Sequence, residues 1–110
     1  MKYINKSLSV EKVKIGKLVK KFNTPIYCYS YDQLKKNINS FKKNFKSFSP
    51  LICFAVKSNS NLNLIREIKK LGLGADVVSV GELTKALKAG INPKKIVFSG
   101  VGKTSAEISY

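Results

Sequence analysis

The sequence predicts an α/β protein in which strands and helices alternate behind a shorter N-terminal segment with a short strand and a helix. The first observation is three apolar runs of strand length: residues 51–56, 75–79 and 96–99. The second is helical periodicity in the stretches between them, over residues 64–71 and 81–89. Short strand–helix–strand connections imply parallel pairing, which fits either an open doubly wound sheet or part of a (β/α)₈ barrel.

The N-terminal segment carries the weaker signals. Apolar residues between Leu8 and Ile15 are compatible with a short hairpin or with the start of a helix. Residues 18–22 have helical spacing, and the Asn-Thr-Pro sequence at 23–25 ends that helix. The β-prone run at residues 26–29 predicts a short strand.

A longer amphipathic helix is predicted after Ser30. Ser30 and Gln33 have the spacing of a capping box, and the helix ends before Ser49. Its apolar stripe recurs at helical intervals: Leu34, Ile38, Phe41 and Phe45. Lysines occupy the remaining faces, which indicates a solvated surface.

Three strand–helix units follow this helix. The continuous apolar run of residues 51–56 predicts a strand buried on both faces, which ends at Lys57. Glycines at the ends of the two intervening helices are typical C-terminal residues: Gly72 and Gly90. Another helix opens at Thr104 by the capping-box spacing. Because Tyr110 lies within the first turns of that helix, we expect the chain to be a fragment.

The composition excludes several classes of function. The net charge is +15, but only Arg66 among the 21 basic residues is an arginine, and the lysines are spread along the chain. Solvated lysine-rich faces therefore fit better than nucleic-acid binding. We expect a cytoplasmic protein without a membrane partner, because no apolar run reaches roughly 20 residues. With no histidine, Cys28 and Cys53 cannot form a zinc site, so we expect free thiols and no metal.

Lys57 is the most informative candidate for chemistry. In parallel α/β folds the active site lies at the carboxyl ends of the strands. At the end of an apolar strand its ammonium group is expected to be partly desolvated, which favours the neutral amine that carbonyl chemistry requires. A side chain that simply extends from the strand end into solvent is the structural alternative.

Asp76 is the second candidate, because it lies inside an apolar strand at the corresponding place on the neighbouring strand. A buried carboxylate needs a partner, and Lys57 is expected within reach. A helix cap or a structural salt bridge is the alternative. Ser79 and Glu82 at the following turn are weaker candidates, because such residues more commonly cap a helix.

Residues 99–104 (Ser-Gly-Val-Gly-Lys-Thr) superficially suggest a phosphate-binding P-loop. That motif requires a glycine five residues before the glycine of its Gly-Lys-Thr end. Val97 occupies this position inside the predicted strand, so the backbone cradle for phosphate is missing and a P-loop is excluded.

Four segments in order resemble a known family. Residues 54–59 (Phe-Ala-Val-Lys-Ser-Asn) resemble the pyridoxal-phosphate attachment pattern of the ornithine/diaminopimelate/arginine decarboxylases. Residues 24–30 resemble the segment that precedes the barrel in the members acting on diaminopimelate. Residues 74–83 and 96–104 resemble their second and third strand regions. The similarity runs from about residue 8 to the end, and for Leu8 to Ile15 it favours extended chain over a helix.

The resemblance implies a fold type III enzyme, a homodimer that binds pyridoxal 5'-phosphate (PLP). Residues 31–110 would be the start of its alanine-racemase-like (β/α)₈ barrel, an incomplete TIM barrel with the first three βα units. Residues 1–30 would join its β domain. Lys57 would form the Schiff base with PLP, and Asp76 would orient Lys57. The weaker cofactor-binding candidates are Asn59 and Ser79.

The implied activity is PLP-dependent decarboxylation of meso-2,6-diaminopimelate to L-lysine and CO₂, the last step of lysine biosynthesis. The alternatives are another decarboxylase of the family, acting on ornithine, arginine or carboxynorspermidine, and a non-catalytic PLP-binding protein. The family also uses a histidine, a glycine-rich loop and partner-subunit residues from later segments. None of those positions occurs here, so we expect the fragment itself to be inactive.

Overall fold

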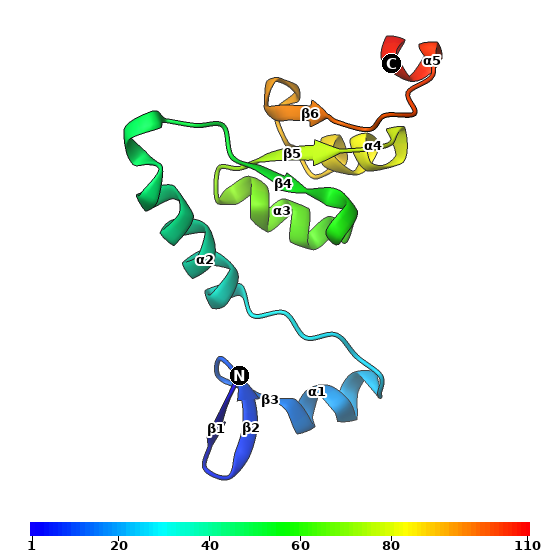
Figure 1. Cartoon of the computed structure of the whole chain (residues 1–110). Helices are drawn as coiled ribbons and strands as arrows, with labels where there is room; N and C mark the ends of the chain where they lie inside the picture. Colours follow the sequence, from blue (N-terminus) through cyan, green and yellow to red (C-terminus); the bar gives the residue numbers. More distant parts are fainter. The chain divides into compact units, whose positions relative to one another are not determined.

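The computed structural model describes residues 1–110, which form two compact units, Met1–Asn44 and Phe45–Tyr110. Figure 1 shows the elements of both units in chain order. None of the helices has the length and apolar character needed to cross a membrane.

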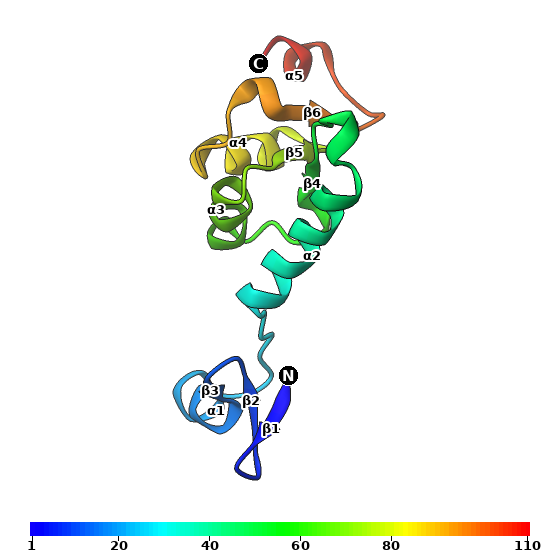
Figure 2. The same ribbon diagram turned by 90° about the vertical axis from the view of Figure 1, so that its left-hand side faces the viewer.

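The N-terminal unit begins with three short antiparallel strands in the order β1–β2–β3 (Figure 2). Their bounds are β1 Lys2–Ile4, β2 Ser7–Val10 and β3 Val13–Lys14. Val10 pairs with Val13, so the hairpin alternative for this stretch is confirmed. Helix α1 (Ile15–Phe22) follows directly, and the chain leaves it at Asn23 with a φ of 61°. This is the stop that the Asn-Thr-Pro sequence predicts.

The strand predicted at residues 26–29 is wrong, because these residues form neither strand nor helix. No strand pairs with their backbone, and the side chains of Tyr27 and Tyr29 are exposed. A β-prone sequence forms a strand only where a neighbouring strand accepts its hydrogen bonds.

Helix α2 (Tyr31–Asn44) is capped from two places in the sequence. The Ser30 hydroxyl accepts a hydrogen bond from the Gln33 backbone N–H at 3.1 Å, as the capping-box spacing predicts. Glu11 adds a second cap: its carboxylate accepts from the Ser30 hydroxyl at 2.8 Å and from the Asp32 backbone N–H at 3.0 Å. These bonds, the one from Asp32 foremost, lower the pKa of Glu11. The helix ends at Asn44, and a 3₁₀ turn, η1 (Lys46–Phe48), follows.

The second unit contains a parallel three-stranded sheet in the order β4–β5–β6. Its strands are β4 Cys53–Ala55, β5 Gly74–Val77 and β6 Ile96–Phe98. The helices are α3 Leu62–Lys70, α4 Val80–Lys88 and α5 Ser105–Ser109, with 3₁₀ turns η2 Val56–Ser58 and η3 Pro93–Lys95. Strand–helix alternation and parallel pairing are therefore confirmed.

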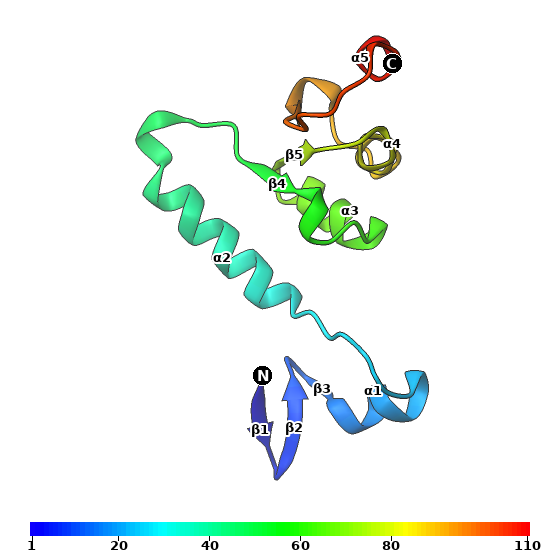
Figure 3. The ribbon, with the colours of Figure 1, turned by 45° about the vertical axis from the view of Figure 1, so that its right-hand side comes forward.

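The core of the second unit lies between one face of this sheet and the helices α3 and α4 (Figure 3). Its fully buried members come from β5, η2 and both helices: Val56, Ile65, Ala75, Val77 and Ala86. The prediction that residues 51–56 are buried on both faces is wrong. Leu51 is exposed and Cys53 to Ala55 are half-buried, because helices of this unit cover only one face.

Helices α3 and α4 end in the same way. Gly72 and Gly90 follow them with φ values of 80° and 85°, in the left-handed region that glycine adopts without steric cost. In each case the next residue donates its N–H back to a carbonyl in the last turn, from Leu73 to Ile68 and from Ile91 to Ala86. Both predicted helix ends are confirmed.

Gly74 has no room for a side chain, and Gly74→Ala should therefore destabilise the second unit. A Cβ at this position would lie 2.1 Å from the carbonyl oxygen of Lys95 and 2.9 Å from Cys53 Sγ. Overpacking of this kind costs about 1–3 kcal/mol in free energy of unfolding, measurable by urea denaturation. Gly81→Ala is the matched control, since its nearest contact is 3.8 Å. Equal stability of the two variants would contradict the assigned strand spacing.

The Glu11 carboxylate should make the N-terminal unit sensitive to acid. The folded-state pKa of Glu11 lies below its ordinary value of 4.5. Its stabilisation is therefore complete above pH 4.5 and is lost as the pH falls through the lower folded value. We expect the amide proton shift of Asp32 to titrate in this range by NMR, and Glu11→Gln to abolish that titration. Glu67→Gln, on α3, should leave it unchanged.

Candidate functional site

The strand register places a polar group of side chains on the sheet face opposite the core. Ala55 pairs with Asp76, and Asp76 pairs with Val97. Because side chains alternate along a strand, Asp76 lies on the same face as Cys53 and Ser99. All of them lie along the strands whose carboxyl ends meet at one edge of the sheet.

Lys57 follows at that edge, in the 3₁₀ turn η2, two residues after Ala55. Its side chain is exposed, so the predicted partial desolvation of the amine is wrong for this chain. The reason is that the last strand residues are covered only on the core side, where Val56 is fully buried. The Nζ amine forms no ion pair and is accessible to a ligand that approaches the carboxyl edge.

Asp76 is half-buried and receives a hydrogen bond from the hydroxyl of Ser99, with 2.5 Å between Ser99 Oγ and Asp76 Oδ1. It neither caps a helix nor forms a salt bridge, so both structural alternatives are wrong. It is not paired with Lys57 in this structure. That Asp76 orients Lys57 therefore stays a prediction.

Cys53 lies on the same face as Asp76, and the charge of Asp76 affects the pKa of its thiol. Burial raises the pKa of the Cys53 thiol, and the Asp76 carboxylate raises it further. The thiol points toward the carbonyl oxygen of Lys95, 3.8 Å away. Cys53 and Cys28 are both free thiols, as predicted.

Asn59 shapes the loop between Lys57 and α3. Its side-chain oxygen accepts from the backbone N–H of Asn61 at 3.0 Å, and Asn61 in turn caps α3. The neighbouring Ser60 hydroxyl accepts from Lys85 Nζ at 2.8 Å, which ties the loop to α4. The contacts of Asn59 are thus local, and its cofactor-binding role stays a prediction.

Ser79 caps α4, as the structural alternative predicted. Its hydroxyl accepts from the Glu82 backbone N–H at 3.3 Å, while the Glu82 carboxylate accepts from the Val78 backbone N–H at 2.9 Å. A role of Ser79 toward the cofactor stays a prediction.

In the loop after β6, the side chain of Lys103 bonds to backbone carbonyls of the same segment. Lys103 Nζ donates to the carbonyls of Phe98, at 3.2 Å, and of Gly100, and it lies 5.1 Å from the centroid of the Phe98 ring. Thr104 then opens α5 with the predicted capping box. The sequence reasoning missed Ser99, the residue bound to Asp76. The sequence does indicate it, because Ser99 ends the predicted third strand, at the carboxyl edge where the other polar candidates lie.

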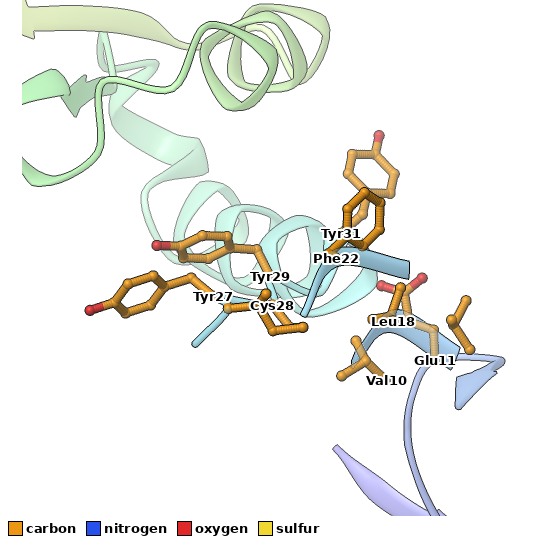
Figure 4. A pocket seen from close by; sticks show the side chains of 10 residues that line it. Val10, Glu11, Leu18, Phe22, Tyr27, Cys28, Tyr29 and Tyr31 are labelled. Atoms are coloured by element: carbon orange, nitrogen blue, oxygen red, sulfur yellow. The ribbon is translucent and has the colours of Figure 1, made fainter. Parts of the chain in front are cut away.

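The N-terminal unit contains a separate apolar pocket of about 480 Å³ (Figure 4). It is lined mainly by aliphatic and aromatic side chains, among them Val10, Leu18, Phe22, Tyr29 and Tyr31. None of the predicted site residues contributes to it. The chemistry-bearing group is therefore at the sheet edge and not in this pocket.

Comparisons with known proteins point to one family. Residues 31–110 match the family model described as pyridoxal-dependent decarboxylase, pyridoxal binding domain. The chain is 50% identical over 91 residues to a diaminopimelate decarboxylase of Helicobacter pylori strain J99, covering 83% of this chain and 22% of that protein.

Solved structures agree with the sequence comparison. The crystal structure of diaminopimelate decarboxylase from Helicobacter pylori complexed with L-lysine superposes with a TM-score of 0.81 at 46% identity, over 86% of this chain and 24% of that one. The diaminopimelate decarboxylase from M. jannaschi gives a TM-score of 0.92 at 37% identity, over 98% and 26%. The α/β fold is thus that of these decarboxylases, and the chain spans about a quarter of their length.

Replacing Asp76 by asparagine should lower the pKa of the Cys53 thiol, because the amide removes the negative charge that disfavours the thiolate. The remaining elevation, from burial, should persist. The pH dependence of alkylation, measured with Cys28→Ser so that one thiol reacts, reads out this shift. Glu67→Gln on α3 is the charge-matched control. An unchanged alkylation profile in Asp76→Asn would rule out the proximity of the two groups.

Proposed function

The chain belongs to the pyridoxal-dependent decarboxylases, and on this premise we propose that it supplies the cofactor-attaching part of an enzyme that converts meso-2,6-diaminopimelate to L-lysine and CO₂. The observation that carries the proposal is Lys57, an accessible amine at the carboxyl edge of a parallel sheet, inside the segment that matches the pyridoxal binding domain. The substrate is proposed from the names of the relatives, of which the chain spans only a quarter.

The residues present fit PLP. Its aldehyde requires a primary amine that is not engaged in an ion pair, and Lys57 Nζ meets that requirement. Asp76, on the adjacent strand, supplies a carboxylate that could accept a hydrogen bond from that amine or from its ammonium form. We assign cofactor attachment to Lys57 and its orientation to Asp76. Asn59 and Ser79 would act by shaping the loops on either side.

When bound, PLP supplies an electron sink that accepts the electron pair left by a departing carboxylate. The residues of this chain would hold and orient the cofactor. Lys57 Nζ would anchor the cofactor and could carry a proton at the same edge. Asp76 would offer a carboxylate at that edge, and the capped helix starts after β4 and β5 hold both loops in place.

We further propose the arrangement of the whole enzyme. Residues 31–110 would form the first three βα units of a (β/α)₈ barrel, with the polar sheet face turned inward. Residues 1–30 would join a separate β domain, and the enzyme would work as a cytoplasmic homodimer. The exposed side chain of Val97 on the polar face supports a barrel, since it would be covered when further strands close the interior.

Lys57 should be the residue that carries the cofactor. Incubation of residues 1–110 with PLP and borohydride should give a covalent pyridoxyl adduct on Lys57, identified by peptide mass spectrometry. Lys57→Arg should abolish it, because a guanidinium does not condense with the aldehyde. Lys88→Arg on α4 is the matched control and should retain the adduct. Labelling spread over many lysines would contradict a specific site.

Decarboxylation should be measured in the full-length enzyme that contains these residues. We expect CO₂ release from meso-diaminopimelate and at least about tenfold lower kcat/KM with ornithine, arginine or carboxynorspermidine. A higher kcat/KM with ornithine, arginine or carboxynorspermidine would contradict diaminopimelate as the substrate. An adduct on Lys57 without any CO₂ release would favour a non-catalytic PLP-binding protein. Residues 1–110 alone should form the adduct without decarboxylating.

A further inference from the structure

The geometry points to Ser99 as a positioning residue that fixes the carboxylate of Asp76 at the edge where Lys57 lies. The inference rests on the proposed function, since it assumes that Asp76 acts toward Lys57. It adds the residue that follows β6 to a site otherwise formed by β5 and the turn after β4. The same loop also resembles a phosphate-binding motif in sequence, and the structure gives it this different role.

Ser99 is bound to β5 at two consecutive residues. Its backbone N–H donates to the carbonyl of Val77 at 3.0 Å, which continues the parallel pairing beyond the end of β6. Its hydroxyl donates to Asp76 Oδ1 at 2.5 Å. Because the backbone bond fixes the position of the hydroxyl, the side-chain bond restricts how Asp76 can rotate.

The loop beyond Ser99 packs closely against the end of the same strand. A Cβ on Gly100 would lie 2.6 Å from the carbonyl oxygen of Val78, so the backbones touch and only glycine fits. Residues 99 and 100 thus contact three consecutive residues of β5 and its end. The Lys103 amine donates to the carbonyls of Phe98 and Gly100 and so holds the turn closed.

The consequence concerns the second oxygen of Asp76. With Oδ1 occupied by Ser99, Oδ2 has no hydrogen-bond partner in the protein. A carboxylate held at one oxygen presents the other in a defined direction, at the edge where Lys57 Nζ is also unpaired. A hydroxyl bond to a charged acceptor is among the stronger hydrogen bonds, and it therefore suits this holding role.

The rotamer of Asp76 can be measured directly, because the chain contains only two aspartates, Asp32 and Asp76. Labelling of aspartate with ¹³C and ¹⁵N gives two sets of NMR signals, and Asp32→Asn assigns them. The three-bond couplings to Cγ report whether χ1 occupies one staggered well. We expect a single rotamer in the wild type and in Ser99→Thr, which keeps the hydroxyl, and averaged couplings in Ser99→Ala. A single unchanged rotamer in Ser99→Ala overturns the inference.

The loop contact gives an independent test with a matched control. Gly100→Ala should displace the loop from Val78 and release Asp76 in the same way as Ser99→Ala. Gly102→Ala, where an added Cβ meets nothing within 4 Å, should leave the couplings unchanged. Ser109→Ala on α5 is the control for loss of a hydroxyl. If Gly100→Ala keeps the wild-type couplings, the loop does not hold Ser99 in place and the inference fails.

The affinity for PLP shows whether Ser99 affects the site at Lys57. The apparent affinity for PLP, measured by absorbance with the full chain, should fall on the order of tenfold in Ser99→Ala and recover in Ser99→Thr. An unchanged affinity in Ser99→Ala overturns the role of Ser99 toward Lys57. Absence of decarboxylation in the full-length enzyme would instead remove the proposed function, while the coupling result for Asp76 would stand on its own.

Discussion

The parallel register that pairs Ala55 with Asp76 and Asp76 with Val97 is the constraint on which the rest of the second unit depends. With this register, Ala75 and Val77 face α3 and α4 and are fully buried. A shift of one residue would turn Asp76 into that apolar core and expose its neighbours, at a large desolvation cost. The packing of the core thus determines which side chains meet on the opposite face.

The polar residues at the carboxyl edge divide into two groups by what they bind. Most are used by the backbone: Asn61, Ser79, Glu82 and Thr104 satisfy N–H groups at the starts of helices. Lys57 forms no ion pair, and Asp76 is held only by Ser99. The amine of Lys57, in the turn after β4, and one carboxylate oxygen of Asp76, on β5, thus have no hydrogen-bond partner in the protein. This separation is the structural basis for assigning function to these two residues.

The N-terminal unit shows how a long-range contact can complete a local motif. Ser30 and Gln33 have the capping-box spacing, yet the Gln33 side chain bonds to Asn37. Glu11 instead adds a cap by accepting from the Ser30 hydroxyl and the Asp32 backbone N–H. The acid comes from the turn between β2 and β3, 19 residues before Ser30. The hairpin and the start of α2 therefore stabilise each other. Without a pairing strand, the β-prone residues between them stay irregular.

The sequence by itself determined the features that depend on neighbouring residues: strand–helix alternation, the glycine ends of α3 and α4, the caps at Ser79 and Thr104, and Lys57 at a strand end. Only the tertiary structure decided which strand face is buried, that Ser99 binds Asp76, and that Glu11 caps α2. The physical reason is distance along the chain. Caps and helix ends join residues three to five apart, whereas Ser99 lies 23 positions from Asp76. Such a contact arises only when the parallel pairing brings two strand ends together.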